Sequence, residues 1–410
     1  MPIALRLIII MLLVFAVQFY FYKRLLASLR LVFRYKPNTK RKIFFWSAFL
    51  YLNVYSIWGT LYFIYVYVTS SPLQSLPQSI FYDYLILFPF WIWILFVIQI
   101  FLLLVPLDLI TLLLTSVRKK HKEKLRKINS YVTVIISSLF IVYVPFRVIY
   151  DLNSIEIRKI KYVSDQLPRL LEGFKITFIS DVQADWHTSK KRVSDFINKI
   201  NLTNPDLVLI GGDIITSTPD YIEFAAQSLR KINSDYGVFS CVGDHDNWAY
   251  RGDTKRSRDE VKSALSSNGI KMLDNEFLTL LIDSTSLGIL SITDTYVERI
   301  DSKKLSELMM QEGNSEFKIL LTHQPGERII ESASKNGFNL FLAGHTHGGQ
   351  VTFLFPFINL TPTLFETKYV HGDFFMNEMM IIVTRGLGVS LVPVRYNSTP
   401  EVTEITLINK

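Results

Sequence analysis

The sequence contains a single cysteine, Cys241, among 410 residues. One cysteine cannot form an intrachain disulfide, which excludes a disulfide-rich secreted scaffold. It does not exclude an exported domain that is stabilised by a large core. Acidic residues are also scarce in residues 1–150, which hold 3 Asp and Glu against 17 Lys and Arg, whereas residues 151–410 hold 33 against 27. Because the basic excess belongs to one part of the chain, the net charge of +8 does not indicate a nucleic-acid partner.

Four long apolar stretches fill the first part of the chain. They lie at about 2–22, 43–68, 82–116 and 131–149. Crossing the hydrocarbon core of a bilayer takes roughly 20 apolar residues, so each stretch is long enough to span a membrane. Four runs with so few charges argue against the alternative, buried helices of a soluble domain. The sequence predicts an all-α transmembrane unit of four helices over residues 1–150 and a second domain over residues 151–410.

Two of these stretches need interpretation. The first lacks a small-residue cleavage site and is followed by Lys23 and Arg24, so we interpret it as a retained span rather than a signal peptide. The third is too long for one straight crossing, and we expect a kink at Pro106. Asp108 then lies at the end of the span, the alternative being a functional acid inside the membrane.

The segments between the stretches predict the orientation of the chain. Residues 23–42 carry eight Lys or Arg and residues 117–130 carry seven, whereas residues 69–80 carry none. Short basic loops stay in the cytoplasm. We therefore expect a multi-pass integral membrane protein whose residues 151–410 lie outside the cytoplasm, on the periplasmic or extracellular face.

The pattern changes after residue 150. Short apolar runs alternate with amphipathic stretches, which indicates a mixed-sheet α/β domain whose sheets are covered on both faces. The runs predict strands at 175–180, 206–212, 237–243, 317–323 and 339–344. The amphipathic stretches predict helices at 189–200, 220–232, 255–268 and 327–335. We also expect two antiparallel pairs, 277–282 with 287–293 and 379–384 with 401–408.

Acids and histidines follow the predicted strands at the point where each strand ends. The five strand ends carry Asp181, Asp213, Asp244, His245, Asp246, His323, His345 and His347. Open α/β sheets bind ligands at the carboxyl ends of their strands. One aspartate after one strand is ordinarily a cap or turn residue, but the repetition at five ends favours a shared site.

Carboxylates and imidazoles gathered in one pocket would repel or stay unsatisfied without a cation. A pair of divalent metals such as Mn, Fe, Zn or Mg suits these ligands. His345 and His347 are two residues apart in an extended segment, so both side chains can point the same way and reach different metals of a close pair. Gly348 and Gly349 allow a tight turn after them.

The ordered set D…GGD…GDHD…TH…GHTHGG makes residues 168–407 resemble the calcineurin-like metallophosphoesterases. The ending TRGLGVSLVPVRYNSTPEVTEITL (384–407) is similar to the membrane-associated branch of that family. The resemblance implies a four-layer αββα sandwich with a dinuclear metal centre. It implies, for one metal, the ligands Asp181, Gln183, Asp213 and His347. It implies, for the other metal, the ligands Asp213, Asp244, His323 and His345, so that Asp213 bridges the pair.

The resemblance also implies that His245 is the acid-base histidine and that Asp246 orients it. Two positions depart from the family's pattern, because Gln183 stands where the family usually has His and Asp244 where it usually has Asn. An amide oxygen is a harder and weaker ligand than imidazole, and a carboxylate adds negative charge. We therefore expect Mn, with Mg, Fe or Zn as alternatives. His187 is either a substitute imidazole or a structural residue at the rim.

Such a centre predicts a membrane-anchored, dinuclear metal-dependent phosphoric ester hydrolase, acting as a phosphodiesterase, phosphomonoesterase or pyrophosphatase. Two metals clamp the phosphate, a hydroxide bridging them attacks phosphorus, and His245 protonates the leaving oxygen. Tethering to the bilayer favours a lipid or lipid-linked phosphate as substrate. The substrate-binding residues are not predicted, since Trp186 and Trp248 either line the mouth of the site or only pack.

Two other hypotheses compete with this one. The first is a catalytically weakened domain that binds metal or a phosphorylated ligand and signals through the transmembrane unit, which Gln183 and Asp244 support. The second is a small transporter with an accessory domain, which the lack of a polar pathway or an inverted repeat argues against. Hydrolysis of a generic phosphodiester with added Mn distinguishes an enzyme from a binding domain.

Overall fold

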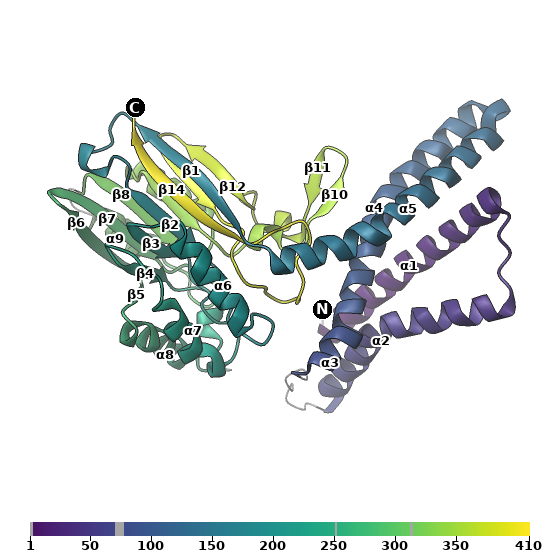
Figure 1. Ribbon diagram of the computed structural model, residues 1–410, viewed down its shortest axis with the longest axis horizontal. Coiled ribbons are helices and arrows are strands. Elements are labelled where there is room, and N and C mark those ends of the chain that lie inside the picture. Colours follow the sequence, from purple (N-terminus) through teal and green to yellow (C-terminus); the bar gives the residue numbers. More distant parts are fainter. Residues whose placement is uncertain (1–2, 70–77, 251, 312–314) are drawn as a thin grey trace. The chain divides into compact units, whose positions relative to one another are not determined.

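The computed structural model describes residues 3–69, 78–250, 252–311 and 315–410, and Figure 1 shows the course of the chain. The chain forms two compact units. The first contains Met1–Ile149 and Phe353–Leu360, and the second contains Tyr150–Thr352 and Thr361–Lys410.

Four helical segments of the described chain are long and apolar enough to cross a membrane. They are α1 (Ile3–Phe33), α2 (Thr39–Thr69), α3 (Ile80–Tyr82) continued by a π turn and α4 (Phe88–Val117), and α5 (Lys122–Asn153). Each helix is longer than the stretch that predicted it, because the flanking Lys and Arg are good helix formers and prolong it. The basic segments are thus mostly helical, and of the expected uncharged loop 69–80, residues 70–77 lie outside the described residues.

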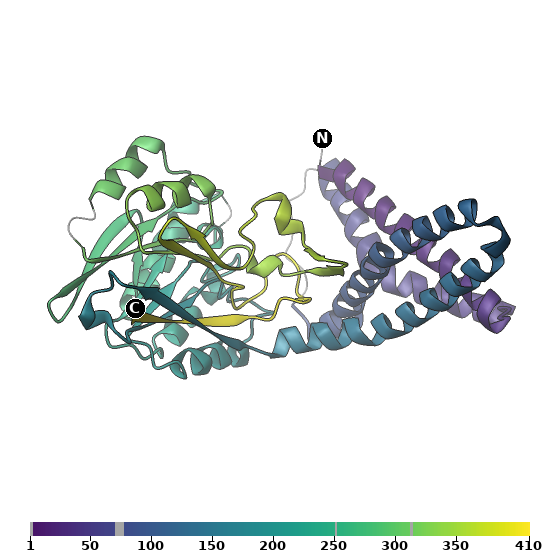
Figure 2. The same ribbon diagram turned by 90° about the horizontal axis from the view of Figure 1, so that it is seen from above.

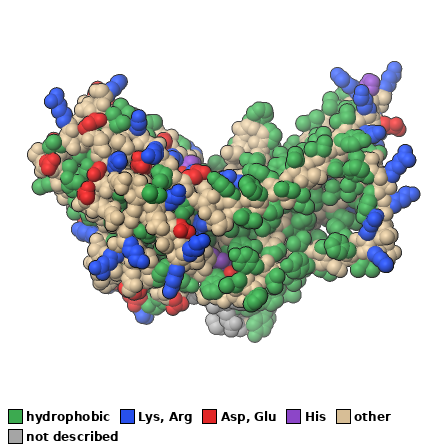
Figure 3. All heavy atoms as spheres, viewed as in Figure 1, with side chains coloured by type: hydrophobic (Ala, Val, Ile, Leu, Met, Phe, Trp, Pro, Cys, Tyr) green, Lys and Arg blue, Asp and Glu red, His purple; other side chains and the backbone are tan. Residues whose placement is uncertain are grey.

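Apolar side chains cover the visible face of these helices, while Lys and Arg gather where α1 meets α2 and where α4 meets α5 (Figure 3). Inside the unit, polar side chains are paired. Gln18 and Asn53 exchange two hydrogen bonds of 2.8 and 2.9 Å between α1 and α2. Asp108 pairs with Arg24 at 2.9 Å, so it is an ion-pair partner between α4 and α1. The helix α4 runs on past Pro106 to Val117.

The second unit contains two six-stranded mixed sheets. The first sheet has the order β1 (Glu156–Ser164), β14 (Glu401–Asn409), β2 (Lys175–Ile179), β3 (Leu207–Ile210), β4 (Val238–Cys241) and β5 (Lys271–Leu273). The second has the order β12 (Gly372–Met376), β13 (Met379–Val383), β9 (Leu340–Ala343), β8 (Phe317–Thr322), β7 (Thr285–Ile292) and β6 (Glu276–Ile282). Helices α6 (Lys190–Asn201), α7 (Ile222–Leu229) and α8 (Thr254–Ser267) cover one sheet, and α9 (Ser302–Met310) and α10 (Glu327–Lys335) cover the other (Figure 2).

Alternation along the strands builds three apolar layers. In β3, Leu207 and Leu209 belong to the core between the sheets, whereas Val208 and Ile210 belong to the core under α6, α7 and α8. In β9, alternate residues face the inner core and the core under α9 and α10 in the same way. Fully burying one such side chain contributes roughly 1.5–3 kcal/mol. The predicted four-layer αββα arrangement is confirmed.

The predicted pairing of 379–384 with 401–408 is wrong. β13 pairs antiparallel with β12 and parallel with β9, whereas β14 lies between β1 and β2 in the other sheet. Two residues separate β12 from β13, and Asn377 between them has a φ of 54°, so a tight hairpin forms within the nearer segment. The other predicted pair, β6 with β7, is confirmed as antiparallel.

Candidate metal centre

The polar residues at the strand ends come together because their strands run parallel. β2, β3 and β4 are parallel neighbours in one sheet, and β8 and β9 are parallel neighbours in the other. The loops that leave these strands therefore meet at one edge of the sandwich, the edge where α/β sheets bind ligands.

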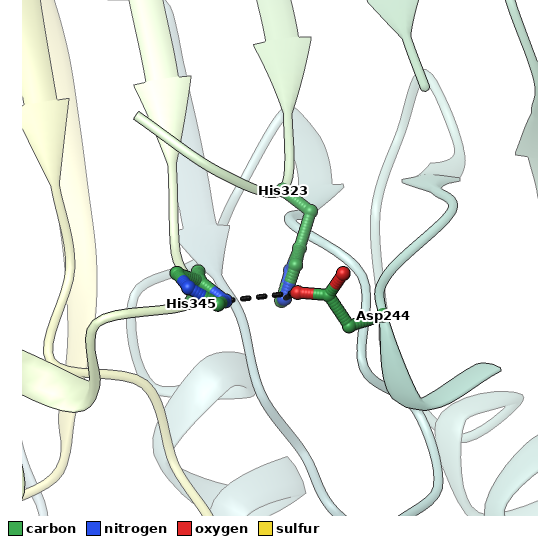
Figure 4. A group of neighbouring side chains, drawn as sticks. All are labelled: Asp244, His323 and His345. Carbon is green, nitrogen blue, oxygen red and sulfur yellow. Dashed lines mark ion pairs between the residues drawn. The ribbon is translucent and has the colours of Figure 1, made fainter. Parts of the chain in front are cut away.

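Two groups of side chains at this edge are arranged as metal ligands. Asp244, His323 and His345 form one group, and Asp181, Asp213 and His323 form the other, with the donor atoms of each group within 4.8 Å of one another. Figure 4 shows the first group, in which Nδ1 of His345 lies 3.0 Å from Oδ2 of Asp244. Since His323 belongs to both groups, they form one continuous centre.

His347 also lies at this centre, with its Nε2 3.3 Å from Oδ1 of Asp181. The turn that carries it depends on two glycines, because Gly348 and Gly349 have φ values of 60° and 84°. The structure thus brings together the acids and histidines expected at two metals.

The backbone at the centre adopts a conformation that side chains disfavour. Positive φ values occur at Asp181 (55°), Gln183 (49°), Asp213 (56°), His345 (70°) and His347 (49°). Non-glycine residues in this region are uncommon and cluster at functional sites, where the surrounding structure holds them in place. The fold therefore keeps these five side chains in fixed positions at an energetic cost.

Three buried polar atoms at the centre have no hydrogen-bond partner among the described residues: Oδ1 of Asp181, Oε1 of Gln183 and Nε2 of His323. An unpaired buried polar group costs about 1–3 kcal/mol, so its presence needs an explanation. All three atoms belong to residues expected to bind metal, and carboxylate, amide oxygen and imidazole are ligands of divalent cations. The donor set therefore fits a metal centre.

The charges at the centre are strongly coupled. Burial acts to lower the pKa of His345, but hydrogen bonds to Asp244 and Glu366 outweigh it and raise the pKa to about 9. Burial acts to raise the pKa of Asp244, but the neighbouring imidazoles of His323 and His345 hold it far below its usual range. The carboxylates and imidazoles of the centre thus shift one another's pKa values in opposite directions.

His347 differs from the other two histidines of the centre. Burial lowers its pKa well below the usual value, and the positive charge of Arg395 lowers it further. Arg395 is itself fully buried, and its guanidinium donates to the backbone carbonyls of Gly388 and Arg385. A neutral imidazole is the form that binds a metal.

The two positions that depart from the family's pattern are accommodated by hydrogen bonds. The amide nitrogen of Gln183 donates to Oδ2 of Asp213 at 2.7 Å. Asp244, which as a carboxylate only accepts, receives hydrogen bonds from the side-chain nitrogen of Gln324 at 2.8 Å and from the backbone N–H of Tyr296 at 2.7 Å. Both replacement side chains thus have hydrogen-bond partners beside the centre.

His245 lies at the edge of the centre, and in the described part of the chain its ring and the carboxylate of Asp246 bond to different partners. Nδ1 of His245 lies within hydrogen-bond distance of the carbonyl of Thr216, and Nε2 lies 3.0 Å from Oγ of Ser390. The carboxylate of Asp246 instead accepts from three backbone N–H groups, those of Asp213, Ile214 and Gly243. These three hydrogen bonds join the Asp246 carboxylate to the loops after β3 and β4, and an orienting role of Asp246 toward His245 stays a prediction.

Three further residues singled out in the sequence lie nearby. The ring of Trp248 packs edge-on against His245, with the ring centroids 4.7 Å apart. The backbone N–H of His187 donates to Asp185 at 2.8 Å, and His187 is in neither group of described metal-ligand candidates. Trp186 is partly buried beside it.

Several residues at the centre were not predicted. They are Tyr296, Gln324, Glu366, Ser390 and Arg395. Gln324 directly follows His323, and Ser390 and Arg395 lie in the ending that resembles the family, so the sequence held a signal for these three. Glu366 contacts Nε2 of His345 at 2.8 Å from an exposed loop that carries no such signal.

Comparison with known proteins agrees with this geometry. The model of the calcineurin-like phosphoesterase family matches residues 174–349. YkuE, a metallophosphoesterase of Bacillus subtilis, is 32% identical over 248 residues, which are 60% of this chain and 82% of that protein. A metallophosphoesterase of Campylobacter jejuni is 29% identical over 294 residues, 70% of this chain and 73% of its own.

The chain belongs to the calcineurin-like phosphoesterase family. A further relative, YaeI of Escherichia coli, is named a phosphodiesterase and is 29% identical over 238 residues, which are 57% of this chain and 82% of that protein. The chain is thus a metallophosphoesterase with candidate metal-ligand groups and with four helices that can cross a membrane.

Proposed function

We propose that this protein is a membrane-anchored, dinuclear metal-dependent phosphohydrolase in which residues 151–410 form the catalytic domain and residues 1–150 the anchor. One observation carries the proposal. Buried ligand atoms of Asp181, Gln183 and His323 have no hydrogen-bond partner among the described residues. Asp181 and His323 form a ligand group with Asp213, and the amide nitrogen of Gln183 bonds the same carboxylate. A pair of cations sharing Asp213 accounts for all of them.

The geometry supports a division of the ligands between two cations. One would be held by Asp181, Gln183, Asp213 and His347. The other would be held by Asp213, Asp244, His323 and His345. When bound, such a pair supplies positive charge for the phosphate oxygens and acidifies a water that can attack phosphorus. Because oxygen atoms dominate this set, we propose Mn as the preferred metal.

The chain's own residues then position and move protons. The carbonyl of Thr216 accepts from Nδ1–H of His245, which leaves Nε2 as the atom that can give a proton to the departing oxygen. The hydroxyl of Ser390 lies 3.0 Å from this Nε2 and fixes its direction. This geometry supports Thr216 in the orienting role that the family resemblance implies for Asp246.

The membrane anchor supports a finer proposal about location and substrate. The basic turns of the helical unit are residues 34–38, between α1 and α2, and residues 118–121, between α4 and α5. Short basic turns stay in the cytoplasm. We propose that the catalytic domain lies on the periplasmic or extracellular face. A phosphate ester attached to a lipid, or linked to one, is the substrate class that such tethering favours.

The test is hydrolysis of bis-p-nitrophenyl phosphate by the purified full-length protein with added Mn, together with its metal content. Asp213→Asn should lose bound metal and activity together. The matched control is Asp283→Asn, since Asp283 also has a positive φ, of 52°, but is exposed in the turn between β6 and β7. Full activity of Asp213→Asn would overturn the proposal.

A second candidate function is a domain that binds metal or a phosphorylated ligand without turnover and signals through the helices. One observation favours it. The hairpin of β10 (Phe353–Phe355) and β11 (Ile358–Leu360) begins four residues after the turn that carries His347 and Gly349, and it groups with the membrane helices. Within that unit, Gln99 bonds both backbone groups of Leu354, at 2.7 and 2.9 Å. Tight Mn binding without any phosphodiester hydrolysis would favour this alternative.

A further inference from the structure

Two loops beside the metal centre expose large apolar side chains almost completely. Phe365 is 98% exposed at the end of a 3₁₀ turn (Pro362–Phe365), and Leu391 is 96% exposed in the loop before Arg395. Single exposed apolar residues are ordinary on a protein surface. Phe365 and Leu391 differ from such residues because both lie next to the metal centre.

Each of the two residues directly adjoins a residue that contacts a histidine of the centre. Glu366, which follows Phe365, lies 2.8 Å from Nε2 of His345. Ser390, which precedes Leu391, lies 3.0 Å from Nε2 of His245. Phe365 and Leu391 therefore lie on the rim of the proposed active site, and we call this pair the apolar rim.

Both loops are fastened to the turn that carries His347. Oγ1 of Thr361 donates to the carbonyl of Gly349 at 2.9 Å. The side-chain nitrogen of Gln350 lies within hydrogen-bond distance of the carbonyls of Ser390 and Val392, at 2.9 Å each, and its oxygen accepts from the N–H of Ser390 at 2.8 Å. The exposure of the apolar rim is thus imposed by a fixed scaffold.

Leu391 also has a strained backbone. Its φ is 61°, in the left-handed region that costs a residue with a side chain roughly 1–2 kcal/mol. A leucine held there and turned outward gains nothing from the folded core, since it is 96% exposed. Strain of this kind points to a function at the position.

The chain itself indicates what covers the apolar rim. The segment directly before it, the β10–β11 hairpin, groups with the helices that can cross a membrane. The tip of this hairpin carries exposed Phe357 and Ile358. Only four residues separate Leu360 at the end of the hairpin from Phe365, so an apolar segment associated with the spans continues directly into the rim.

We propose that the apolar rim inserts into the surface of the lipid bilayer that anchors the chain, so that the metal centre opens onto the lipid headgroups. Aromatic and aliphatic side chains that enter the interface bind it through their buried apolar area. If the proposed hydrolase function holds, on which this consequence rests, the substrate is a phosphate ester carried by an amphiphile whose phosphate lies at headgroup level.

The docking is tested on the full-length protein in lipid nanodiscs. Phe365→Cys and Leu391→Cys are labelled with an environment-sensitive dye, and quenching by lipids that carry a nitroxide near the headgroup is measured. Leu202→Cys and Leu281→Cys are the matched controls, because both leucines are exposed in the same unit, 66% and 69%. The native Cys241 is fully buried and gives little background.

We expect quenching at positions 365 and 391 to be at least about threefold stronger than at 202 and 281, while Mn binding confirms that each variant is folded. Equal quenching at all four positions would overturn the proposal, because the rim would then face water. Rim labels that are shielded both from the lipid quencher and from a water-soluble quencher would also overturn it, since a protein partner would then cover the rim.

A second measurement separates this proposal from the hydrolase function. The variant Phe365→Ser/Leu391→Ser is compared with wild type in the ratio of rates for a long-chain and a short-chain p-nitrophenyl phosphodiester. We expect this ratio to fall at least about fivefold, and an unchanged ratio would contradict the substrate class. If the wild type hydrolyses neither compound, the proposed function has failed, whereas the quenching result still decides the docking.

Discussion

The side-chain nitrogen of Gln183 donates to Oδ2 of Asp213 at 2.7 Å, while the carbonyl oxygen of the same amide is buried without a hydrogen-bond partner among the described residues. One end of the amide is thus fixed by a ligand carboxylate, and the other end is free to bind a cation. Glutamine is polar at both ends, so it fills the place of the family's usual histidine without blocking the centre.

This relationship predicts the effect of restoring the histidine. Gln183→His should raise the affinity for Zn about tenfold or more, because imidazole is a better ligand for Zn than an amide oxygen. Gln183→Leu should lower the affinity for Mn, since it removes the oxygen while keeping a similar volume. Titration calorimetry on the metal-free protein measures both. Unchanged affinities in both variants would show that residue 183 does not touch the metal.

Because His245 and Asp246 have different hydrogen-bond partners, we expect substitution of His245 to lower turnover and substitution of Asp246 to lower stability. His245→Ala should lower turnover by about 100-fold or more, as the loss of a general acid does, while the metal content and the melting temperature stay near those of the wild type. Asp246→Asn should instead lower the melting temperature, because an amide cannot accept from all three N–H groups of Asp213, Ile214 and Gly243. Thermal unfolding and phosphodiester hydrolysis measured on the same samples separate the two effects. An Asp246→Asn protein as stable as wild type would contradict this account.

A buried carboxylate far from the metal ligands in the sequence predicts a pH dependence of stability. Burial acts to raise the pKa of Glu401, but the hydrogen bond of His371 and the charges of Arg385 and Arg158 outweigh it and lower the pKa from 4.5 to about 2. A lowered carboxyl pKa stabilises the folded state above the unfolded-state value, and that contribution is lost as the pH falls from 4.5 toward 2. At neutral pH it amounts to on the order of 3 kcal/mol.

Unfolding of wild type and Glu401→Gln at two pH values checks this expectation. The variant should be clearly less stable at about pH 6, and the difference should shrink to less than half at about pH 3. Glu331→Gln is the control, because Glu331 is exposed on α10. A difference that stays constant between the two pH values would show that the charge of Glu401 does not stabilise the fold.

The contact between Glu366 and His345 predicts a positioning role. Nδ1 of His345 faces Asp244 and Nε2 faces Glu366, an arrangement in which a carboxylate orients a metal-binding imidazole. Glu366→Ala should therefore weaken Mn binding about tenfold, and Glu366→Gln should recover most of it, because the amide oxygen still accepts from Nε2–H. Glu327→Ala is the control, since Glu327 is exposed and pairs with Lys368. Equal Mn affinity of Glu366→Ala and wild type would remove Glu366 from the centre.

The sequence predicted the metal-ligand candidates more completely than it predicted the pairing of the strands that carry them. Asp181 and His323 were predictable because each directly follows an apolar strand, and parallel strands end at a common edge. The contacts of Glu366 with His345 and of Thr216 with His245 were not, since they join loops far apart in the sequence and one of them uses a backbone carbonyl. The partner of β13 was missed because the edge strand β12 has only five residues, begins with Gly and Asp, and is only partly buried.

The orientation of the chain in the membrane gives the last prediction. His121 lies in the basic turn between α4 and α5, and Leu281 lies exposed in β6. If the basic turns are cytoplasmic, a membrane-impermeant maleimide should label Leu281→Cys in intact cells from outside, and should label His121→Cys only after lysis. Burial strongly raises the pKa of the native Cys241 thiol, so the unmodified protein serves as a silent background. Labelling of His121→Cys in intact cells, with Leu281→Cys protected, would place the catalytic domain in the cytoplasm and would exclude substrates of the outer leaflet.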